Sequence, residues 1–399
     1  MSNATTRILT GARVIDPASG LDGPAEIAIE GDRIAAVGCE LAARYPGAEV
    51  IDLSGHIVTP GLIDLHTHVM HGLGDFCVHP DDAGVRTGVT TVVDAGTSSA
   101  SIIGMVRRGI IDNPDIATRV LAMMDPCKIY IATSDFVAHH LEIANDLRNL
   151  DVDLAKAMVE EHGEIIVGFK VRACVAKDGD PETSPFLDAA QEIAGERPVI
   201  IHFGGFPYTK VMPPLNLVRQ LRGGDIITHA FRAGSGILDA NNEPVQDFVD
   251  AAERGVVLDV GHSKGDFHIP TARHLFALGY PPTTISSDLN AFNIGGPVYN
   301  LTETMSKIWA LGIGLPDVIA MVTTHTAKVI HRSETLGALA PGREADITCL
   351  TVEEGEFVLD DGYEQMVSHR LLVAEGCWRA GQWFPAERRG AALPMQAAS

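Results

Sequence analysis

Gly61-Leu62-Ile63-Asp64-Leu65-His66-Thr67-His68 is a short, mostly apolar run that ends in two histidines. An apolar run of this length is typical of a parallel strand that is covered on both faces. Because side chains alternate along a strand, His66 and His68 point to the same face, and two such imidazoles can bind one metal ion. The stretch therefore predicts a buried strand with a metal-binding pair at its end.

Similar apolar runs recur through the middle of the chain. They are separated by segments with apolar residues at three- and four-residue spacing, such as 141–161, 243–254 and 301–313, which is typical of amphipathic helices. Eight alternations over about 270 residues predict a (β/α)8 TIM barrel, an α/β fold. Strand counting alone leaves a doubly wound sheet open as the alternative. The eight runs span residues 61–65, 90–94, 120–124, 165–171, 199–202, 226–229, 256–260 and 283–287.

Four more of these runs lead into an ionisable residue, namely Lys170, His202, His229 and Asp288. Barrel active sites are built from the C-terminal ends of several strands. His202 and His229 would add imidazole ligands, and Asp288 would bridge to a metal-bound water or accept its proton. Nitrogen and oxygen ligands without thiolate suit Zn²⁺, Mn²⁺, Fe²⁺ or Co²⁺.

Lys170 is unusual because it follows the apolar stretch Ile165-Ile166-Val167-Gly168-Phe169. A buried, unpaired ammonium is costly, so this side chain needs a partner or a chemical change. It could form an ion pair with a carboxylate. Alternatively, modification to a carbamate would turn it into an oxygen ligand between two metals. The residues alone leave both interpretations open.

The two ends of the chain show a different pattern, with short segments of alternating apolar and polar residues broken by Gly, Asp and Pro. This pattern predicts antiparallel strands from both termini, which we expect to form one small composite β-sandwich. The predicted division is 1–57 for its first part, 58–334 for the barrel, 335–390 for its second part and 391–399 for a C-terminal tail.

Composition excludes some classes of partner. Thirty Lys and Arg against 52 Asp and Glu give a formal net charge of −22 at pH 7, which argues against nucleic acid and anionic membranes. The six cysteines are widely spaced, residues 1–11 lack the apolar core that a signal peptide requires, and we find no uncharged run of about 18 residues. We therefore expect a cytoplasmic protein with a small-molecule substrate. We also expect it to assemble as a homo-oligomer.

These residues resemble the amidohydrolase superfamily of metal-dependent hydrolases. Residues 57–68 are similar to its first-strand signature, and residues 337–347 are similar to its return into the small β-domain. Within the superfamily the likeness is closest to the deacetylase, or dihydroorotase-like, branch. That likeness rests on residues 167–172, 224–229, 258–262 and 296–301.

The resemblance implies two divalent metal ions, with Zn²⁺ as the expected ion. His66, His68 and Asp288 would hold the first ion, and His202 and His229 the second. Lys170, carboxylated on its N6 atom, would bridge them. The implied reaction is attack of a metal-bridging hydroxide on an amide or ester carbonyl. Asp288 would take the proton of the attacking hydroxide and deliver it to the leaving group.

The same resemblance implies a deacetylase or deacylase that acts on a small N-acyl or O-acyl compound carrying a carboxylate. Arg172 is the candidate anchor for that carboxylate, with a salt bridge at the barrel mouth as the alternative. His262 is a candidate contact for the substrate or the tetrahedral intermediate. Asn290 and Tyr299 are further candidate contacts. Ser263 and Asn290 depart from the glycine and histidine typical of the branch, which puts substrate identity in doubt.

Three other functions remain as alternatives. A cyclic amidohydrolase would open a ring, as dihydroorotases and hydantoinases do. A ring deaminase is disfavoured by Lys170, because deaminases of this superfamily generally bind one metal without a carboxylated lysine. A non-catalytic structural or interaction relative is disfavoured because every expected ligand is present.

Overall fold

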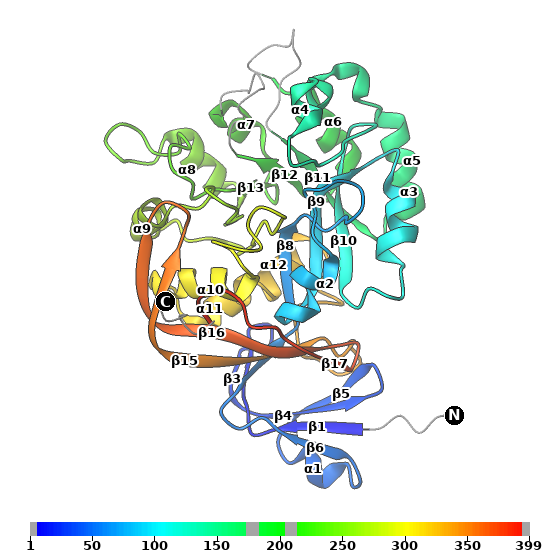
Figure 1. Cartoon of the computed structure of the whole chain (residues 1–399), viewed down its shortest axis with the longest axis vertical. Coiled ribbons are helices and arrows are strands. Elements are labelled where there is room, and N and C mark those ends of the chain that lie inside the picture. The colour runs from blue at the N-terminus through cyan, green and yellow to red at the C-terminus, as the bar shows by residue number, and fades with distance from the viewer. Residues whose placement is uncertain (1–5, 173–182, 204–213, 393–399) are drawn as a thin grey trace, which may run out of the picture.

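One curled parallel sheet in the middle of the chain carries the candidate site (Figure 1). The computed structural model describes residues 6–172, 183–203 and 214–392. Among these residues, seven strands follow one another in the sheet in chain order, each parallel to the next. They are β8 (Leu62–Thr67), β9 (Val89–Ser99), β10 (Arg119–Asp125), β11 (Ile166–Val171), β12 (Val199–His202), β13 (Ile226–Thr228) and β14 (Val257–Leu258).

The eighth predicted run is not a regular strand, yet it lies between the two edges of the sheet. Thr284 pairs with Asp259 and Leu289 pairs with Thr67 through isolated parallel bridges. The Asp288 amide donates to the His66 carbonyl over 2.7 Å, which brings Asp288 beside the first strand. The buried Asp64 side chain also holds this segment beside β8, because its Oδ1 accepts a hydrogen bond from the Ser287 amide over 3.0 Å. A closed eight-stranded barrel goes beyond the seven strands described and stays a prediction.

Helices pack around this sheet (Figure 1). Several begin at the residue types that favour helix starts, because a side-chain oxygen of Asp151, Ser184 or Asn300 accepts from a backbone amide of the first turn. The helices are α2 (Pro80–Ala83), α3 (Ile103–Val106), α4 (Val137–His140), α5 (Val152–His162), α6 (Pro185–Ala194), α7 (Pro214–Gln220), α8 (Gln246–Glu253), α9 (Ile269–Ala277), α10 (Leu301–Ala310), α11 (Leu315–Met321) and α12 (Thr324–Val329).

The strands of the central sheet are buried on both faces. Leu62 joins the large apolar core shared with the helices, whereas its neighbour Ile63 joins a second cluster with Val93 and Ile200. Polar side chains on such strands must find partners within the protein.

None of the described helices is long and apolar enough to cross a membrane.

Strands from both ends of the chain share a sheet below the central one (Figure 1). Among the described strands its order is β17-β16-β15-β7-β2-β3, and a second sheet has the order β5-β4-β1-β6. The composite sandwich stays a prediction, and residues 393–399 of the predicted tail lie outside the described residues. The strands are β1 (Thr6–Thr10), β2 (Arg13–Asp16), β3 (Leu21–Pro24), β4 (Glu26–Glu30), β5 (Arg33–Gly38), β6 (Glu49–Asp52), β7 (Ile57–Pro60), β15 (Ile347–Asp360), β16 (Gln365–Arg379) and β17 (Gln382–Pro385), with helix α1 (Leu41–Arg44) before β6.

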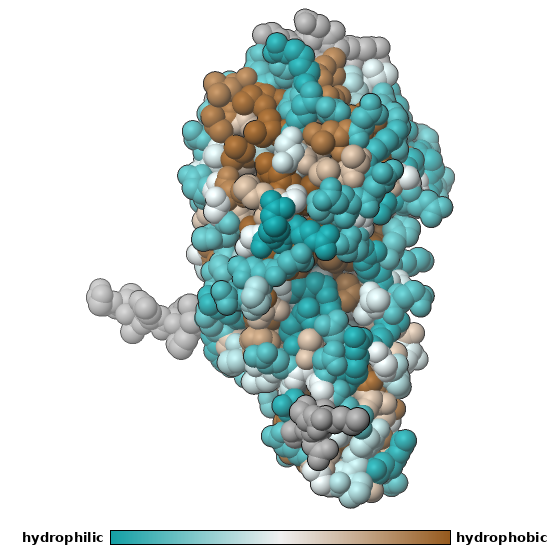
Figure 2. Space-filling model, turned by 90° about the vertical axis from the view of Figure 1, so that its right-hand side faces the viewer, coloured by the Kyte–Doolittle hydropathy of each residue, from teal (hydrophilic) through white to brown (hydrophobic). Residues whose placement is uncertain are grey.

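The surface differs between the two parts of the molecule. Figure 2 shows hydrophobic side chains gathered on the upper part of one face, above a mostly hydrophilic lower part. Several of the exposed large apolar residues belong to the segment that follows β10, among them Ile129, Ile131 and Leu141. This segment also contributes to the wall of the candidate site.

Candidate active site

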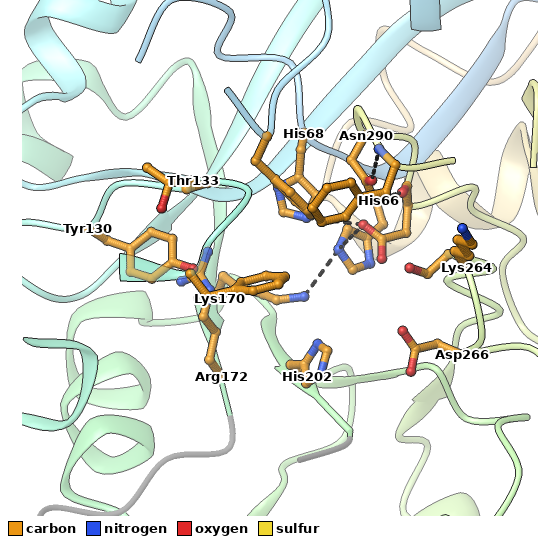
Figure 3. Close-up of a pocket in the computed structure, with 16 residues that line it drawn as sticks. His66, His68, Tyr130, Thr133, Lys170, Arg172, His202, Lys264, Asp266 and Asn290 are labelled. Carbon is orange, nitrogen blue, oxygen red and sulfur yellow. Dashed lines mark hydrogen bonds and ion pairs between the residues drawn. The ribbon is translucent and has the colours of Figure 1, made fainter. Parts of the chain in front are cut away.

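A cavity of about 390 Å³ opens at the C-terminal ends of the central strands (Figure 3). Its floor, as we use the term below, consists of His66, His68, Lys170, His202 and Asp288. Four of these side chains are buried and His202 is half-buried. They come from β8 and the residue directly after it, from β11 and β12, and from the segment after residue 287, so the structure brings together residues that are far apart in the sequence.

Two histidines and one aspartate of the floor converge on a single point. Asp288 Oδ1 lies 3.1 Å from His68 Nε2 and 3.4 Å from His66 Nε2. This carboxylate oxygen is buried and accepts no hydrogen bond from the described residues. A buried oxygen without a hydrogen-bond donor is costly, but it is the arrangement that a cation would stabilise. The donor set therefore fits a divalent metal ion.

The protonation state of His66 suits a metal ligand. Its pKa lies well below the ordinary value because of burial and the nearby Lys170, so the ring is neutral. His66 Nδ1 lies 2.9 Å from the Thr228 hydroxyl, which in turn donates to Asp259 Oδ2 over 2.8 Å. The hydroxyl must therefore accept from His66 Nδ1–H, which leaves the Nε2 lone pair facing Asp288. Outer partners of this kind orient metal-binding histidines.

His68 has a matching partner, since its Nδ1 lies 2.9 Å from the Thr97 hydroxyl. Thr97 is itself held by its backbone amide, which donates to the buried Asp94 over 2.8 Å. His66 and His68 thus each have a threonine behind the ring and an aspartate behind the threonine. These partners hold both rings in position.

His202 and His229 form a second pair of ring nitrogens. His229 Nε2 lies 3.1 Å from His202 Nδ1, and His229 Nδ1 donates to the Gly261 carbonyl over 2.6 Å. Donation through Nδ1 leaves the His229 Nε2 lone pair directed at the site. His229, Asp266 and Asp288 form a second group of possible ligands among the described residues. Asp266 was not predicted from the sequence.

Lys170 reaches the same floor, where its Nζ lies 3.2 Å from His66 Nε2. Burial lowers the pKa of this amine to about 7, against the opposing effect of Asp288. The backbone of Gly96 allows the approach, because a Cβ added there would lie 2.5 Å from Lys170 Cβ. A buried amine with such a low pKa is partly neutral near pH 7, which is the state that can be carboxylated.

Asp288 is held in an unusual backbone conformation, with φ of 50°. Its carbonyl accepts hydrogen bonds from the side chains of Asn290 and Asn293, each over 2.8 Å. Burial would raise the pKa of Asp288, but the His68 ring and the positive charges nearby outweigh that effect and lower it. The carboxylate is therefore ionised and available as a ligand or proton acceptor.

The four predicted substrate contacts lie in different places. Arg172 and Asn290 line the cavity. His262 is fully buried, with Nδ1 donating to the Ser263 carbonyl over 2.7 Å and Nε2 lying 3.0 Å from Lys307 Nζ. Its Nε2 therefore accepts from a lysine rather than facing the cavity. Tyr299 is not among the residues that line the cavity, and its pKa is raised by burial and by the Glu303 carboxylate.

Arg172 is already engaged. One guanidinium nitrogen pairs with Asp125, and Nη2 donates to the Gly96 carbonyl over 2.5 Å. The guanidinium carbon lies 3.5 Å from the centre of the Tyr130 ring. The ion pair that the sequence left open as an alternative is thus present at this position.

Residues that the sequence analysis did not single out complete the rim, which we define as Tyr130, Phe136, Lys264 and Phe292. Phe136 and Phe292 pack near Phe76, with ring centres 5.8 and 5.4 Å from it. Tyr130 and Phe136 lie in the segment after β10, Lys264 lies after β14, and Phe292 follows the segment that carries Asp288. Barrel enzymes place substrate-binding loops at such strand ends. Their place after the strand ends was the signal in the sequence that could have identified the rim residues. Their residue types alone did not distinguish them from ordinary surface residues.

Comparisons with known proteins identify the family. A deacetylase of Enterococcus faecalis (strain ATCC 700802 / V583) is 33% identical over 350 residues, which cover 85% of this chain and 89% of that protein. The chain belongs to the amidohydrolase superfamily. Crystal structures of an adenine deaminase and a dihydroorotase each superpose on this amidohydrolase with a TM-score of 0.82, at 29% and 27% identity. Each covers 96% of this chain and 100% of the other chain.

The predicted superfamily membership, in its deacetylase branch, is therefore confirmed, and this amidohydrolase is a hydrolytic enzyme. No family model matches the chain. Relatives with three different names share the fold, so the fold alone does not select the substrate.

Proposed function

We propose that this amidohydrolase cleaves the amide or ester bond of a small N-acyl or O-acyl compound at a binuclear metal centre. The observation that carries the proposal is the convergence of His66, His68 and the unpartnered oxygen of Asp288 in a buried cavity. The deacetylase name of a relative that matches most of the chain supports the acyl substrate. A cavity of about 390 Å³ suits a small molecule.

We assign the metal ligands as follows. His66, His68 and Asp288 would hold one ion, His202 and His229 the other, and carboxylated Lys170 would bridge them. The low pKa of Lys170 supports the modification, since the neutral amine is the form that adds carbon dioxide. We propose Zn²⁺ because the donors are imidazole nitrogens and carboxylate oxygens.

The metal ions, when bound, would lower the pKa of water and polarise the substrate carbonyl. The protein supplies the proton transfers. The ionised Asp288 accepts a proton from the attacking water at a carboxylate oxygen and returns it to the leaving amine or alcohol. Its fixed backbone, held by Asn290 and Asn293, keeps that oxygen in place between the two steps.

Two of the predicted substrate contacts enter this proposal. Asn290 and Arg172 line the cavity and would shape the pocket around the substrate. Direct substrate contacts by His262 and Tyr299 stay predictions. We also propose that residues 283–287 complete an eight-stranded barrel spanning 58–334, and that 1–57 and 335–390 form the sandwich. Homo-oligomeric assembly and a cytoplasmic location stay predictions as well.

The experiment that tests the function is a substrate screen of the Zn²⁺-loaded enzyme with acyl-amino acids, acylated hydroxy acids, cyclic amides and adenine. The proposal expects turnover of a linear acyl compound, abolished in Lys170→Ala together with a lower metal content. Ring opening or ammonia release as the dominant reaction would contradict it. Near-wild-type turnover in Lys170→Ala would show that the lysine is structural.

A further inference from the structure

We infer that Lys264 is the cation that binds an anionic group of the substrate, and that the tip of the β15–β16 hairpin holds it in position. This inference rests on the proposed function, because it concerns the substrate of the same cavity. It assigns the role predicted for Arg172 to a residue on another loop. The substrate class it indicates is an acyl compound with a carboxylate.

Arg172 is the residue that the sequence favoured as the anchor for a substrate carboxylate. Arg172 is buried and its charge is matched by Asp125, with a further donor occupied by the Gly96 carbonyl. One face of its guanidinium lies over Tyr130. A substrate carboxylate would have to compete with a buried carboxylate already in place, and separating a buried ion pair is costly. Arg172 is therefore better explained as part of the cavity wall.

Lys264 is a second cation, on the other side of the cavity. Figure 3 shows Lys264 across the cavity from Arg172 and Tyr130, beyond the floor histidines. Lys264 is exposed and lines the cavity, and no ion pair joins its ammonium to a carboxylate of the described residues. The nearby Asp266 is directed to Arg232, with 3.4 Å between Oδ1 and Nη1. Among the described lining residues, Lys264 is thus the cation that an incoming anion can pair with at least cost.

Hydrogen bonds with the tip of the β15–β16 hairpin hold the loop that carries Lys264. The Tyr363 hydroxyl donates to the Gly265 carbonyl over 3.0 Å, directly after Lys264. The Ile269 amide donates to Asp361 Oδ2 over 2.7 Å. Gly265 has φ of 115°, which favours glycine, and a Cβ there would lie 3.1 Å from the Tyr363 hydroxyl. The hairpin tip therefore fastens the loop on the C-terminal side of Lys264.

The Ser263 amide fastens the other side, since it donates to the Ser287 carbonyl over 3.0 Å. Lys264 thus projects from a backbone held at both ends, next to the segment that carries Asp288. A lysine side chain is flexible, and fixing its backbone limits the freedom it loses when an anion binds. The long β15 and β16 strands, which rise beside α9 in Figure 1, bring the hairpin tip to this loop.

The test uses an acyl-amino acid and its neutral primary amide, which differ only in the negative charge. For the carboxylate substrate, Lys264→Met should raise KM by about tenfold and leave kcat nearly unchanged, as expected for a lost charge-assisted contact. KM for the amide should not change, and Lys264→Arg should restore most of the discrimination. Lys328→Met, which removes an exposed lysine from α12, is the matched charge control and should behave as wild type.

Tyr363→Phe tests the hairpin. It removes the hydrogen bond to Gly265 while leaving Lys264 unchanged, so the carboxylate preference should fall by about threefold without a change in amide KM. An unchanged carboxylate-to-amide ratio in Tyr363→Phe would overturn the positioning role. An unchanged carboxylate-to-amide ratio in Lys264→Met, with both compounds still hydrolysed, would overturn the role of Lys264. The proposed function would then still stand.

Calorimetric binding separates the two proposals when turnover is absent. Carboxylate binding that exceeds amide binding in the wild type, and loses that excess in Lys264→Met, would support the inference even if neither compound is hydrolysed. Absence of hydrolysis for every acyl compound would then contradict only the proposed function. Equal binding of the two compounds by the wild type would overturn the inference.

Discussion

The floor and the rim of the cavity are built differently. The floor residues sit at strand ends or directly beside β8, where neighbouring backbones and buried partners fix each side chain. His66, for example, is held through Thr228 by Asp259. The rim residues come from loops, and Lys264 and Phe292 are exposed to solvent. The side chains for the chemistry are therefore preorganised by the sheet, whereas substrate selection is left to loops.

The largest effect should come from the floor. Asp288→Asn keeps an oxygen ligand but removes the proton acceptor, so kcat should fall by about 10²–10⁴-fold. Metal content measured on the same preparation should remain close to wild type. An unchanged kcat would contradict the proton-transfer role and would remove the functional distinction between floor and rim.

The next effect should come from behind the floor. Thr228→Val is nearly isosteric but cannot accept from His66 Nδ1–H, so metal affinity should weaken by about 10–100-fold. Thr228→Ser retains the hydroxyl and is the matched control. Affinity is measured by competition with a chelator, independently of activity. Equal affinities for the valine and serine variants would show that the hydroxyl does not orient His66.

A smaller effect is expected at the rim. Phe292→Ala should raise KM by about 3–10-fold with kcat retained, because contact with a partly exposed ring is worth about 1 kcal/mol. Steady-state kinetics on the acyl substrate found in the screen would measure it. If kcat fell as far as in Asp288→Asn, the rim would take part in the chemistry and the comparison would fail.

The smallest effect concerns stability at low pH and the buried His139, whose Nε2 lies 3.3 Å from the hydroxyl of the rim residue Tyr130. Burial lowers the pKa of His139 to about 3, against an ordinary value of 6.5. Between these values the unfolded chain binds more protons than the folded chain, so stability falls as the pH falls from 6.5 towards 3. His139→Gln should make the melting temperature less dependent on pH in this window. An identical pH dependence for the two proteins would show that His139 does not titrate in this way.

The floor could be predicted from the sequence because strand ends leave a clear pattern. An apolar run that stops at His, Lys or Asp identifies both the strand and the end where the site lies. The seven regular strands begin or end within a few residues of the predicted runs. The eighth segment lacks regular pairing, and the positive φ of Asp288 within it leaves no signal in the residue types.

The rim and the partners of predicted residues could not be foreseen in this way. The contact of His262 with Lys307 joins residues 45 positions apart in the chain, and that of Arg172 with Asp125 joins residues 47 apart. Both pairings depend on packing rather than on local pattern. The role inferred for Lys264 depends in addition on a hairpin about a hundred residues further along the chain.

The central claim is that the buried floor binds divalent metal, and metal analysis tests it most directly. Wild-type protein and His66→Ala/His68→Ala would be incubated with Zn²⁺, freed of unbound ions and analysed for metal per chain. We expect about two zinc ions per wild-type chain, as for a site with a bridging ligand, and a clear loss in the double variant. Fewer than one ion per wild-type chain, or equal content in both proteins, would contradict it.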